Sequence, residues 1–165
     1  MTIETVYLAG GCYWGLEDLL RKIPGVVETA VGFSGGHVKN VCYREVTTGT
    51  TGHAETVKVM FDSEVLSFTD LLRFFFKIHN PTTLNQQGND IGTQYRSAIF
   101  STTSEQVFLA EDLIKKIDAS GVLGHKITTE VNTFNSFFLA EENHQKYIEK
   151  YPDGYSCHFI RDINI

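Results

Sequence analysis

The sequence predicts an α+β protein, a ferredoxin-like split β-α-β sandwich with a mixed or mainly antiparallel sheet, packed helices and long functional loops. Short runs of alternating apolar residues, typical of strands, are separated by stretches with apolar residues at helical spacing. Together they give the order β-α-β, long loop, β-α, long loop, β, then α-β-α. Residues 34–53 and 80–93 are polar segments without a clear period, and loops that long inside a compact domain are usually functional.

The first half of the chain holds three predicted strands and two predicted helices. The strands cover residues 5–9, 26–33 and 55–61. A helix is expected over residues 14–22, because its first turn is acidic, its last turn is basic and Pro24 stops it. Ser67 is expected to cap the second helix, with Asp70 three residues on as an acidic partner.

The second half holds two predicted strands and two predicted helices. The strands cover residues 95–101 and 127–131, and the helices cover residues 103–117 and 140–151. Thr103 and Gln106 have the spacing of a capping box, and Pro152 ends the last helix. Residues from about 152 to 165 are expected to form a flexible C-terminal tail. We therefore expect a single domain over residues 1–165.

Composition excludes several classes of function. The net charge is −6, which argues against nucleic-acid or anionic-membrane partners. Neither a signal peptide nor a spanning helix is visible, so a cytoplasmic protein is expected. The three cysteines are widely spaced and form no Cys-x-x-Cys motif, which makes a disulfide scaffold or a metal site unexpected.

Cys12 is the first candidate for chemistry. It follows Gly10-Gly11 at the junction between a predicted strand and a predicted helix, where N–H groups and the helix dipole lower the pKa of a thiol. A buried structural cysteine needs no such setting, so we interpret Cys12 as a nucleophile. Tyr13 and Trp14 are either core aromatics or an apolar wall for a small substrate group.

Glu55 is the second candidate. It shares the strand parity of Val57, Val59 and Phe61, so its side chain is expected on the apolar face. Burial raises the pKa of a carboxyl group and supplies a general acid near neutral pH. The alternative from parity alone is a glutamate at a strand end that reaches solvent.

Five segments, in order, resemble one enzyme family. They read GGCYWGLE, YREVTTGTTGHAETVKVMFD, QGNDIGTQYRSAIF, ITTEV and FFLAEENHQKYIEKYP, and they cover nearly the whole chain from residue 7 to residue 155. They are similar to segments of the peptide-methionine (S)-S-oxide reductases, the A-type methionine sulfoxide reductases. The resemblance implies reduction of methionine-(S)-sulfoxide, free or in oxidised proteins, and hence protein repair under oxidative stress.

The resemblance also implies roles for named residues. The thiolate of Cys12 would attack the sulfoxide sulfur and become a sulfenic acid. Glu55 would hydrogen-bond and protonate the sulfoxide oxygen. Three further residues would complete the oxygen site, with Tyr43 and Tyr95 binding the oxygen and Asp90 positioning the site. The substrate's methyl group would be held by Trp14, with Tyr13 beside it.

Departures from the family pattern concern the pocket wall and the recycling thiol. Tyr13 stands where the family usually has Phe, and Cys42 stands where it has Thr or Ser. Cys157 lies in a Gly-Tyr-x-Cys segment of the tail, and the family often keeps its resolving thiol in such a tail. We expect Cys157, rather than Cys42, to form a disulfide with Cys12. A thioredoxin or a small dithiol would reduce that bond, without any other cofactor, in a monomeric enzyme.

Rival interpretations remain open from the residues. A Cys-His hydrolase or acyl transferase could use His53, His144 or His158 as its base. A thiol peroxidase would prefer peroxide to sulfoxide. A peptide-binding module would use the aromatic pocket without turnover.

Overall fold

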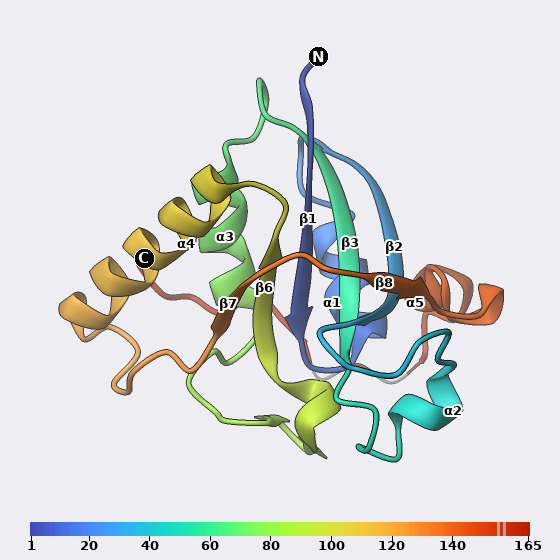
Figure 1. The fold of residues 1–165 in the computed structure, drawn as a ribbon. Helices are drawn as coiled ribbons and strands as arrows, with labels where there is room; N and C mark the ends of the chain where they lie inside the picture. The colour runs from blue at the N-terminus through green and yellow to red at the C-terminus, as the bar shows by residue number, and fades with distance from the viewer. Residues whose placement is uncertain (155, 157) are drawn as a thin grey trace.

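A computed structural model describes residues 1–154, 156 and 158–165. Its main feature is a curled mixed sheet with the strand order β7-β6-β1-β3-β2-β8, shown in Figure 1. The strands are β1 Ile3–Gly10, β2 Val26–Ser34, β3 Ala54–Asp62, β6 Ser97–Ser101, β7 Glu130–Thr133 and β8 Phe137–Leu139.

Strand β1 lies in the middle of the sheet and pairs antiparallel with β3 and with β6. Strand β2 pairs antiparallel with β3 and with β8, whereas β7 joins β6 in parallel. Because β3 lies between β1 and β2, the first β-α-β unit is split by another strand. The prediction of an α+β protein with a mixed sheet is confirmed, and the finer description as ferredoxin-like stays a prediction.

Three helices pack around this sheet: α1 Tyr13–Leu20, α3 Phe68–Ile78 and α4 Ser104–Ser120. Leu16 of α1 and Phe75 of α3 are fully buried in one core with Leu8 and Val57 of the sheet. On the opposite face, the chain between β7 and β8 crosses the sheet, as Figure 1 shows. There the ring of Phe134 stacks on Tyr7, with 4.1 Å between ring centroids.

Helices α3 and α4 begin at the N-cap residues that the sequence predicts. The Ser67 hydroxyl accepts the N–H of Asp70 at 3.1 Å, and the Thr103 hydroxyl accepts the N–H of Gln106 at 3.1 Å. The side chain of Gln106 does not close a reciprocal box, because its oxygen accepts the N–H of Thr102 instead. Both helices therefore begin where the sequence predicts.

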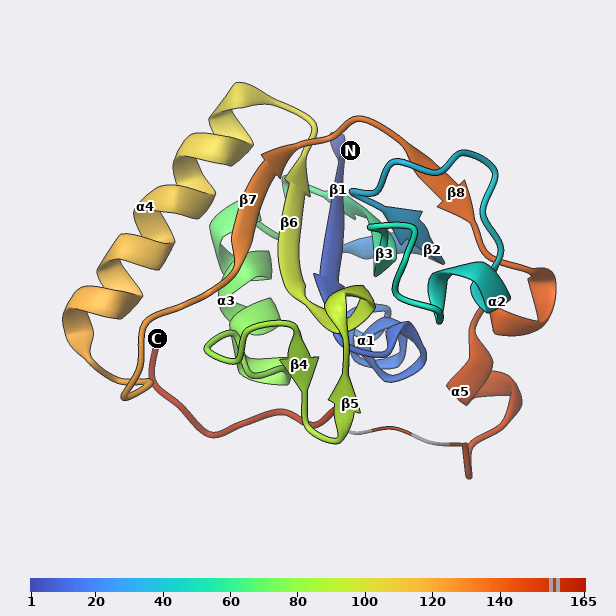
Figure 2. The ribbon, with the colours of Figure 1, turned by 60° about the horizontal axis from the view of Figure 1, so that its bottom comes forward.

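The two polar segments hold short elements that the sequence did not reveal. Residues 34–53 contain α2 Tyr43–Val46, while residues 80–93 contain the small hairpin of β4 Gln86–Gln87 and β5 Asp90–Ile91. The strand predicted from residue 95 begins only at Ser97, because Tyr95 ends the 3₁₀ turn η1 Thr93–Tyr95. Figure 2 shows these elements around the start of α1, at the end of β1.

The predicted last helix is wrong. Residues 140–151 form the 3₁₀ turn η2 Glu142–His144 and the short helix α5 Tyr147–Lys150, and Lys146 between them has a positive φ of 50°. The cause lies in long-range hydrogen bonds. The side chain of Gln145 bonds the N–H and the carbonyl of Val31, while the N–H of Lys146 is donated to Glu17 at 2.7 Å. These partners bend the chain where a regular helix would continue.

The last predicted strand is displaced, and β8 was missed. Strand β7 begins at Glu130, because the N–H of Ile127 is donated to Asp118 and the N–H of Thr128 to the carbonyl of Pro81. Strand β8 has only three residues, and its partner β2 is far away in sequence. Among the described residues, no helix is long and apolar enough to span a bilayer.

Candidate active site

Cys12 lies at the junction of β1 and α1, where the sequence placed it. It is the N-cap of α1, and its side chain is buried, with 5% exposure. Gly11 has φ = 94°, and a Cβ there would meet the side chain of Gln87 at 2.6 Å. The turn therefore requires glycine at that position, and it delivers the thiol to the first turn of the helix.

Glu55 is fully buried on β3, on the same face as Val57. Its Oε1 accepts the backbone N–H of Tyr13 at 3.2 Å, and its Oε2 has no hydrogen-bond partner among the described residues. Burial raises the pKa of Glu55 to about 8; the Tyr13 N–H opposes this shift and Asp90 adds to it. The carboxyl group is therefore largely protonated at neutral pH, and the alternative of a solvent-exposed glutamate is wrong.

The structure brings Tyr43, Tyr95 and Asp90 toward the same place from separate elements. Tyr43 begins α2, Tyr95 ends η1, and Asp90 lies on β5. Burial, and then the neighbouring charge of Glu55, raises the pKa of Tyr43 to about 12 and also raises the pKa of Tyr95. Cys12 and Asp90 act on both tyrosines in the same direction. These five residues thus interact electrostatically, and both phenols keep their protons at neutral pH.

The aromatic residues after Cys12 have different environments. The ring of Tyr13 is fully buried, 5.7 Å from Phe33, and its hydroxyl has no hydrogen-bond partner among the described residues. Trp14 is only part-buried and stacks on Tyr147, with 4.0 Å between ring centroids. Both rings lie about equally far from Tyr43, at 6.1 and 6.2 Å. Tyr13 is therefore part of the core, and Trp14 offers the more accessible surface.

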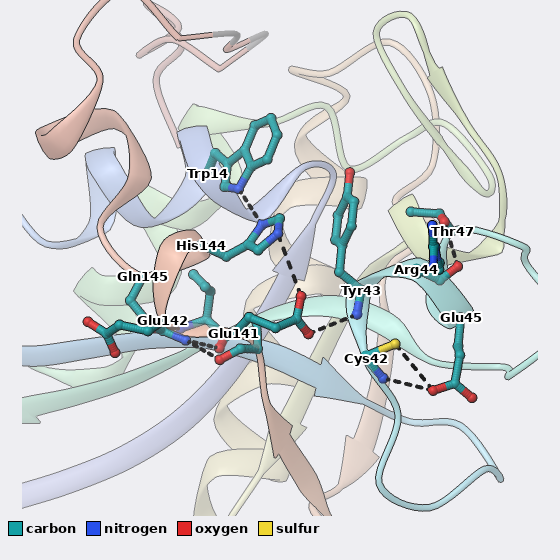
Figure 3. Close-up of polar contacts among 12 residues, drawn as sticks. Trp14, Cys42, Tyr43, Arg44, Glu45, Thr47, Glu141, Glu142, His144 and Gln145 are labelled. Carbon is teal, nitrogen blue, oxygen red and sulfur yellow. Dashed lines mark hydrogen bonds and ion pairs between the residues drawn. The ribbon is translucent and has the colours of Figure 1, made fainter.

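Sequence reasoning missed the partners of Trp14. Its indole N–H is donated to Nδ1 of His144 at 2.9 Å, and Nε2 of His144 lies 3.7 Å from Glu141 (Figure 3). Glu141 also accepts the backbone N–H of Tyr43 at 3.1 Å. The segment FFLAEENHQKYIEKYP contains both residues, but nothing in its local pattern indicates a contact with Trp14 or Tyr43.

Two described residues of the tail, Ser156 and His158, pack on the glycines around Cys12. The Nε2–H of His158 donates a hydrogen bond to the carbonyl oxygen of Gly10, with 2.6 Å between nitrogen and oxygen. A Cβ on Gly15 would meet the ring of His158 at 2.8 Å and would also collide with the hydroxyl of Ser156. Cys157 lies outside the described residues, so its role stays a prediction.

Cys42, the other candidate resolving thiol, caps α2 beside Tyr43. It is part-buried, and its thiol is donated to a carboxylate oxygen of Glu45 at 3.3 Å (Figure 3). Its chain neighbour Tyr43 is one of the residues that interact electrostatically with Cys12 and Glu55, so Cys42 lies next to this group in the chain.

One of the rival bases has a structural role. His53 is 1% exposed. Its Nδ1 accepts a hydrogen bond from the N–H of Gly36, and its Nε2–H donates one to the carbonyl oxygen of Val38. Both ring nitrogens therefore hold the turn at residues 36–38. Within residues 1–154, 156 and 158–165, no group of three or more His, Cys, Asp or Glu is placed to hold a metal ion.

Comparison with known proteins identifies relatives over nearly the whole chain. The family described as peptide methionine sulfoxide reductase matches residues 4–164. Peptide methionine sulfoxide reductase MsrA 1 of Mesorhizobium japonicum is 52% identical over 158 residues, which cover 96% of this chain and 90% of that protein. The MsrA of Streptomyces coelicolor is 51% identical with the same coverage of both chains.

Solved structures with a similar fold include proteins of the same kind. Reduced Mxr1 of Saccharomyces cerevisiae has a TM-score of 0.92 and 35% identity, covering 97% of this chain and 93% of its own. Methionine sulfoxide reductase A of Corynebacterium diphtheriae has a TM-score of 0.86 and 42% identity, covering 94% and 78% of the two chains. Mxr1 has also been solved in complex with Trx2, in a structure with 23% identity and a TM-score of 0.66.

Proposed function

This chain belongs to the peptide methionine sulfoxide reductase family, and we propose that Cys12 is its nucleophile and Glu55 its general acid. The enzyme reduces methionine sulfoxide by thiol chemistry. We assign it the S epimer, both free and within oxidised proteins. The observation that carries the assignment of roles is the bond from the N–H of Tyr13 to Glu55, because it sets the acid beside the thiol.

The reaction transfers one oxygen atom from sulfoxide to thiol. The N-terminal end of α1 favours negative charge on Cys12, whose thiolate attacks the sulfoxide sulfur. The protonated carboxyl group of Glu55 donates its proton to the oxygen as the sulfur–oxygen bond weakens. The hydroxyl group so formed passes from the substrate sulfur to the sulfur of Cys12 while the bond between the two sulfurs breaks. Methionine leaves reduced, Cys12 is oxidised to a sulfenic acid, and Glu55 is left as a carboxylate.

The remaining site residues bind and orient the sulfoxide. Tyr43 and Tyr95 keep their phenolic protons, so both hydroxyls can donate hydrogen bonds to its oxygen. Asp90 positions the site through its charge. Trp14, with Tyr13 behind it in the core, holds the methyl group of the substrate.

A second thiol regenerates Cys12. It condenses with the sulfenic acid, forming a disulfide and releasing water. We favour Cys157 over Cys42, since Ser156 and His158 on either side of it in sequence pack against the glycines around Cys12. A thioredoxin-type dithiol then reduces the disulfide, in line with the complex of Mxr1 with Trx2. No other cofactor is proposed.

The scaffold explains how distant residues meet. We interpret it as a ferredoxin-like split β-α-β unit, because β3 lies between β1 and β2 and so carries Glu55 to the strand that ends before Cys12. We propose that residues 1–165 form one catalytic domain that works as a cytoplasmic monomer.

The test is a single turnover with a chromophore-tagged methionine sulfoxide peptide. Cys12→Ser should release no methionine peptide and should keep its circular dichroism, whereas the matched control Cys42→Ser should release one equivalent. The mass of the wild-type protein should show a gain of one oxygen or a loss of two hydrogens. Appreciable release by folded Cys12→Ser would overturn the assignment, and turnover of peroxide but not of sulfoxide would favour a thiol peroxidase.

A further inference from the structure

A polar chain that no proposed chemical step uses joins two aromatic residues that we assign to the substrate. It runs from Trp14 on α1, through His144 and Glu141, to the backbone of Tyr43 on α2 (Figure 3). Glu141 and His144 come from the short segment after β8, which is η2 with its N-cap. The three elements that meet here are far apart in sequence, so only the folded protein forms the chain.

The direction of each contact determines the state of His144. An indole N–H can only donate, so Nδ1 of His144 must accept it. The single proton of the neutral ring is therefore on Nε2, which faces Oε2 of Glu141 at 3.7 Å. The negative carboxylate favours that tautomer through its charge, because the distance is too long for a strong hydrogen bond.

Glu141 holds the other side with its second oxygen. Its Oε1 accepts the N–H of Tyr43, the first residue of α2. The His144 ring lies between the two aromatic residues, 5.5 Å from Trp14 and 4.4 Å from Tyr43. It is 7% exposed, so the ring has little room to turn. One carboxylate thus restrains both the residue assigned to the methyl group and a residue assigned to the oxygen.

We propose that His144 and Glu141 are positioning residues of the sulfoxide pocket, setting the rotation of the Trp14 indole and its separation from Tyr43. This inference rests on the proposed function of those two aromatic residues. Neither His144 nor Glu141 donates a proton to the substrate. Their removal should widen the pocket and weaken binding more than it slows chemistry at saturation.

The arrangement requires a neutral His144. Burial lowers the pKa of His144, and Glu141 opposes that shift. The groups that face the ring are Tyr13 and Trp14 from α1, Tyr43 from α2 and Tyr147 from α5. When pH falls through this lowered pKa, both ring nitrogens become donors and the indole N–H loses its acceptor. The contact should then break, reversibly, on the acidic side.

Trp14 itself reports the outcome, because it is the chain's single tryptophan. We would compare His144→Phe, which has no acceptor, with His144→Gln, whose carbonyl can accept and which does not titrate. Glu141→Gln keeps an oxygen for Tyr43 but loses the charge. Glu142→Gln is the matched control, since its exposed carboxylate is 3.7 Å from the Lys150 ammonium and touches no pocket residue that we assign.

His144→Phe should raise KM for the sulfoxide peptide by about fivefold, the loss expected for one hydrogen bond, with kcat nearly unchanged. The KM of His144→Gln should be close to that of the wild type. The KM of Glu141→Gln should lie between those of His144→Gln and His144→Phe. Wild-type Trp14 fluorescence should titrate on acidification, while that of His144→Gln should stay flat.

Fluorescence separates this inference from the proposed function, because it needs no turnover. If His144→Phe and Glu141→Gln match Glu142→Gln in both KM and emission, the inference is wrong. A Trp14 emission that changes on acidification in the same way in His144→Gln as in the wild type would also overturn the inference. Failure of the wild type to reduce sulfoxide, with the titration present, would instead overturn the proposed function alone.

Discussion

The buried carboxyl group of Glu55 accepts the backbone N–H of Tyr13, the residue directly after Cys12. This bond ties β3 to the first turn of α1, across 42 residues of sequence. It occupies Oε1 and leaves Oε2 without a hydrogen-bond partner among the described residues. A buried acid with one oxygen fixed and the other available is suited to protonating an oxygen atom of a bound molecule.

Glu55→Gln should lower the single-turnover rate at neutral pH by roughly 10²-fold, the usual scale for loss of a general acid. Glutamine keeps the shape and a hydrogen-bond donor but has no transferable proton. The deficit should be smallest at low pH, where solvent supplies protons, and the wild-type rate should decline as pH rises through about 8. Stopped-flow measurement of methionine-peptide release over a range of pH gives the single-turnover rates of both proteins. Equal rates for the two proteins at pH 7 would remove Glu55 from the role of acid.

The same residue predicts a pH dependence of folding stability. The pKa of Glu55 in the folded protein, about 8, lies above its ordinary value of 4.5. The folded state therefore binds this proton more tightly than the unfolded chain. Its stabilising contribution is full below pH 4.5 and is lost as pH rises through about 8.

The free energy of unfolding in urea should therefore decline over this window in the wild type and decline less in Glu55→Gln. Glu142→Gln, with its exposed carboxylate, should follow the wild type. Parallel curves for all three proteins would mean that Glu55 is ionised in the folded state.

Strand periodicity located Glu55 but could not locate Glu141 or His144. Alternation along a strand reports which face a side chain takes, and this sufficed for a residue on β3. The partners of Trp14 depend instead on a bend at Lys146, which arises because its N–H is donated to Glu17, 129 residues away in sequence. Local patterns hold no record of such a contact, so the segment resembled a continuous helix.

The burial of Tyr13 predicts a gain in stability on removing its hydroxyl. That hydroxyl is buried without a hydrogen-bond partner among the described residues, an arrangement that costs about 1–3 kcal/mol. Tyr13→Phe keeps the ring against Phe33, so its free energy of unfolding should rise by about 1 kcal/mol or more. KM for the sulfoxide peptide should change little. A less stable variant would show that the hydroxyl has a partner in the folded protein.

The packing of the tail depends on a glycine. Gly15→Ala places a methyl group where the ring of His158 and the hydroxyl of Ser156 lie. Alanine favours a helix more than glycine does, so α1 should keep its stability while the tail is displaced. The single-turnover release of methionine should persist, and dithiol-driven cycling should slow several-fold. Ser156→Ala, which only removes an atom, is the control. Unchanged cycling in Gly15→Ala would show that tail contacts at Gly15 do not serve recycling.

The last prediction assigns the recycling thiol. Cys157→Ser should still release one methionine per chain, because reduction of the sulfoxide needs only Cys12. It should lose most thioredoxin-driven cycling yet keep some with dithiothreitol, which can reach a sulfenic acid directly. Cys42→Ser should cycle normally, because the thiol of Cys42 bonds Glu45 at the cap of α2 and stands where the family has Thr or Ser.

Mass spectrometry after one turnover should find the Cys12–Cys157 disulfide in Cys42→Ser and a sulfenic acid in Cys157→Ser. If Cys157→Ser cycles normally with thioredoxin and Cys42→Ser does not, the two thiols exchange roles.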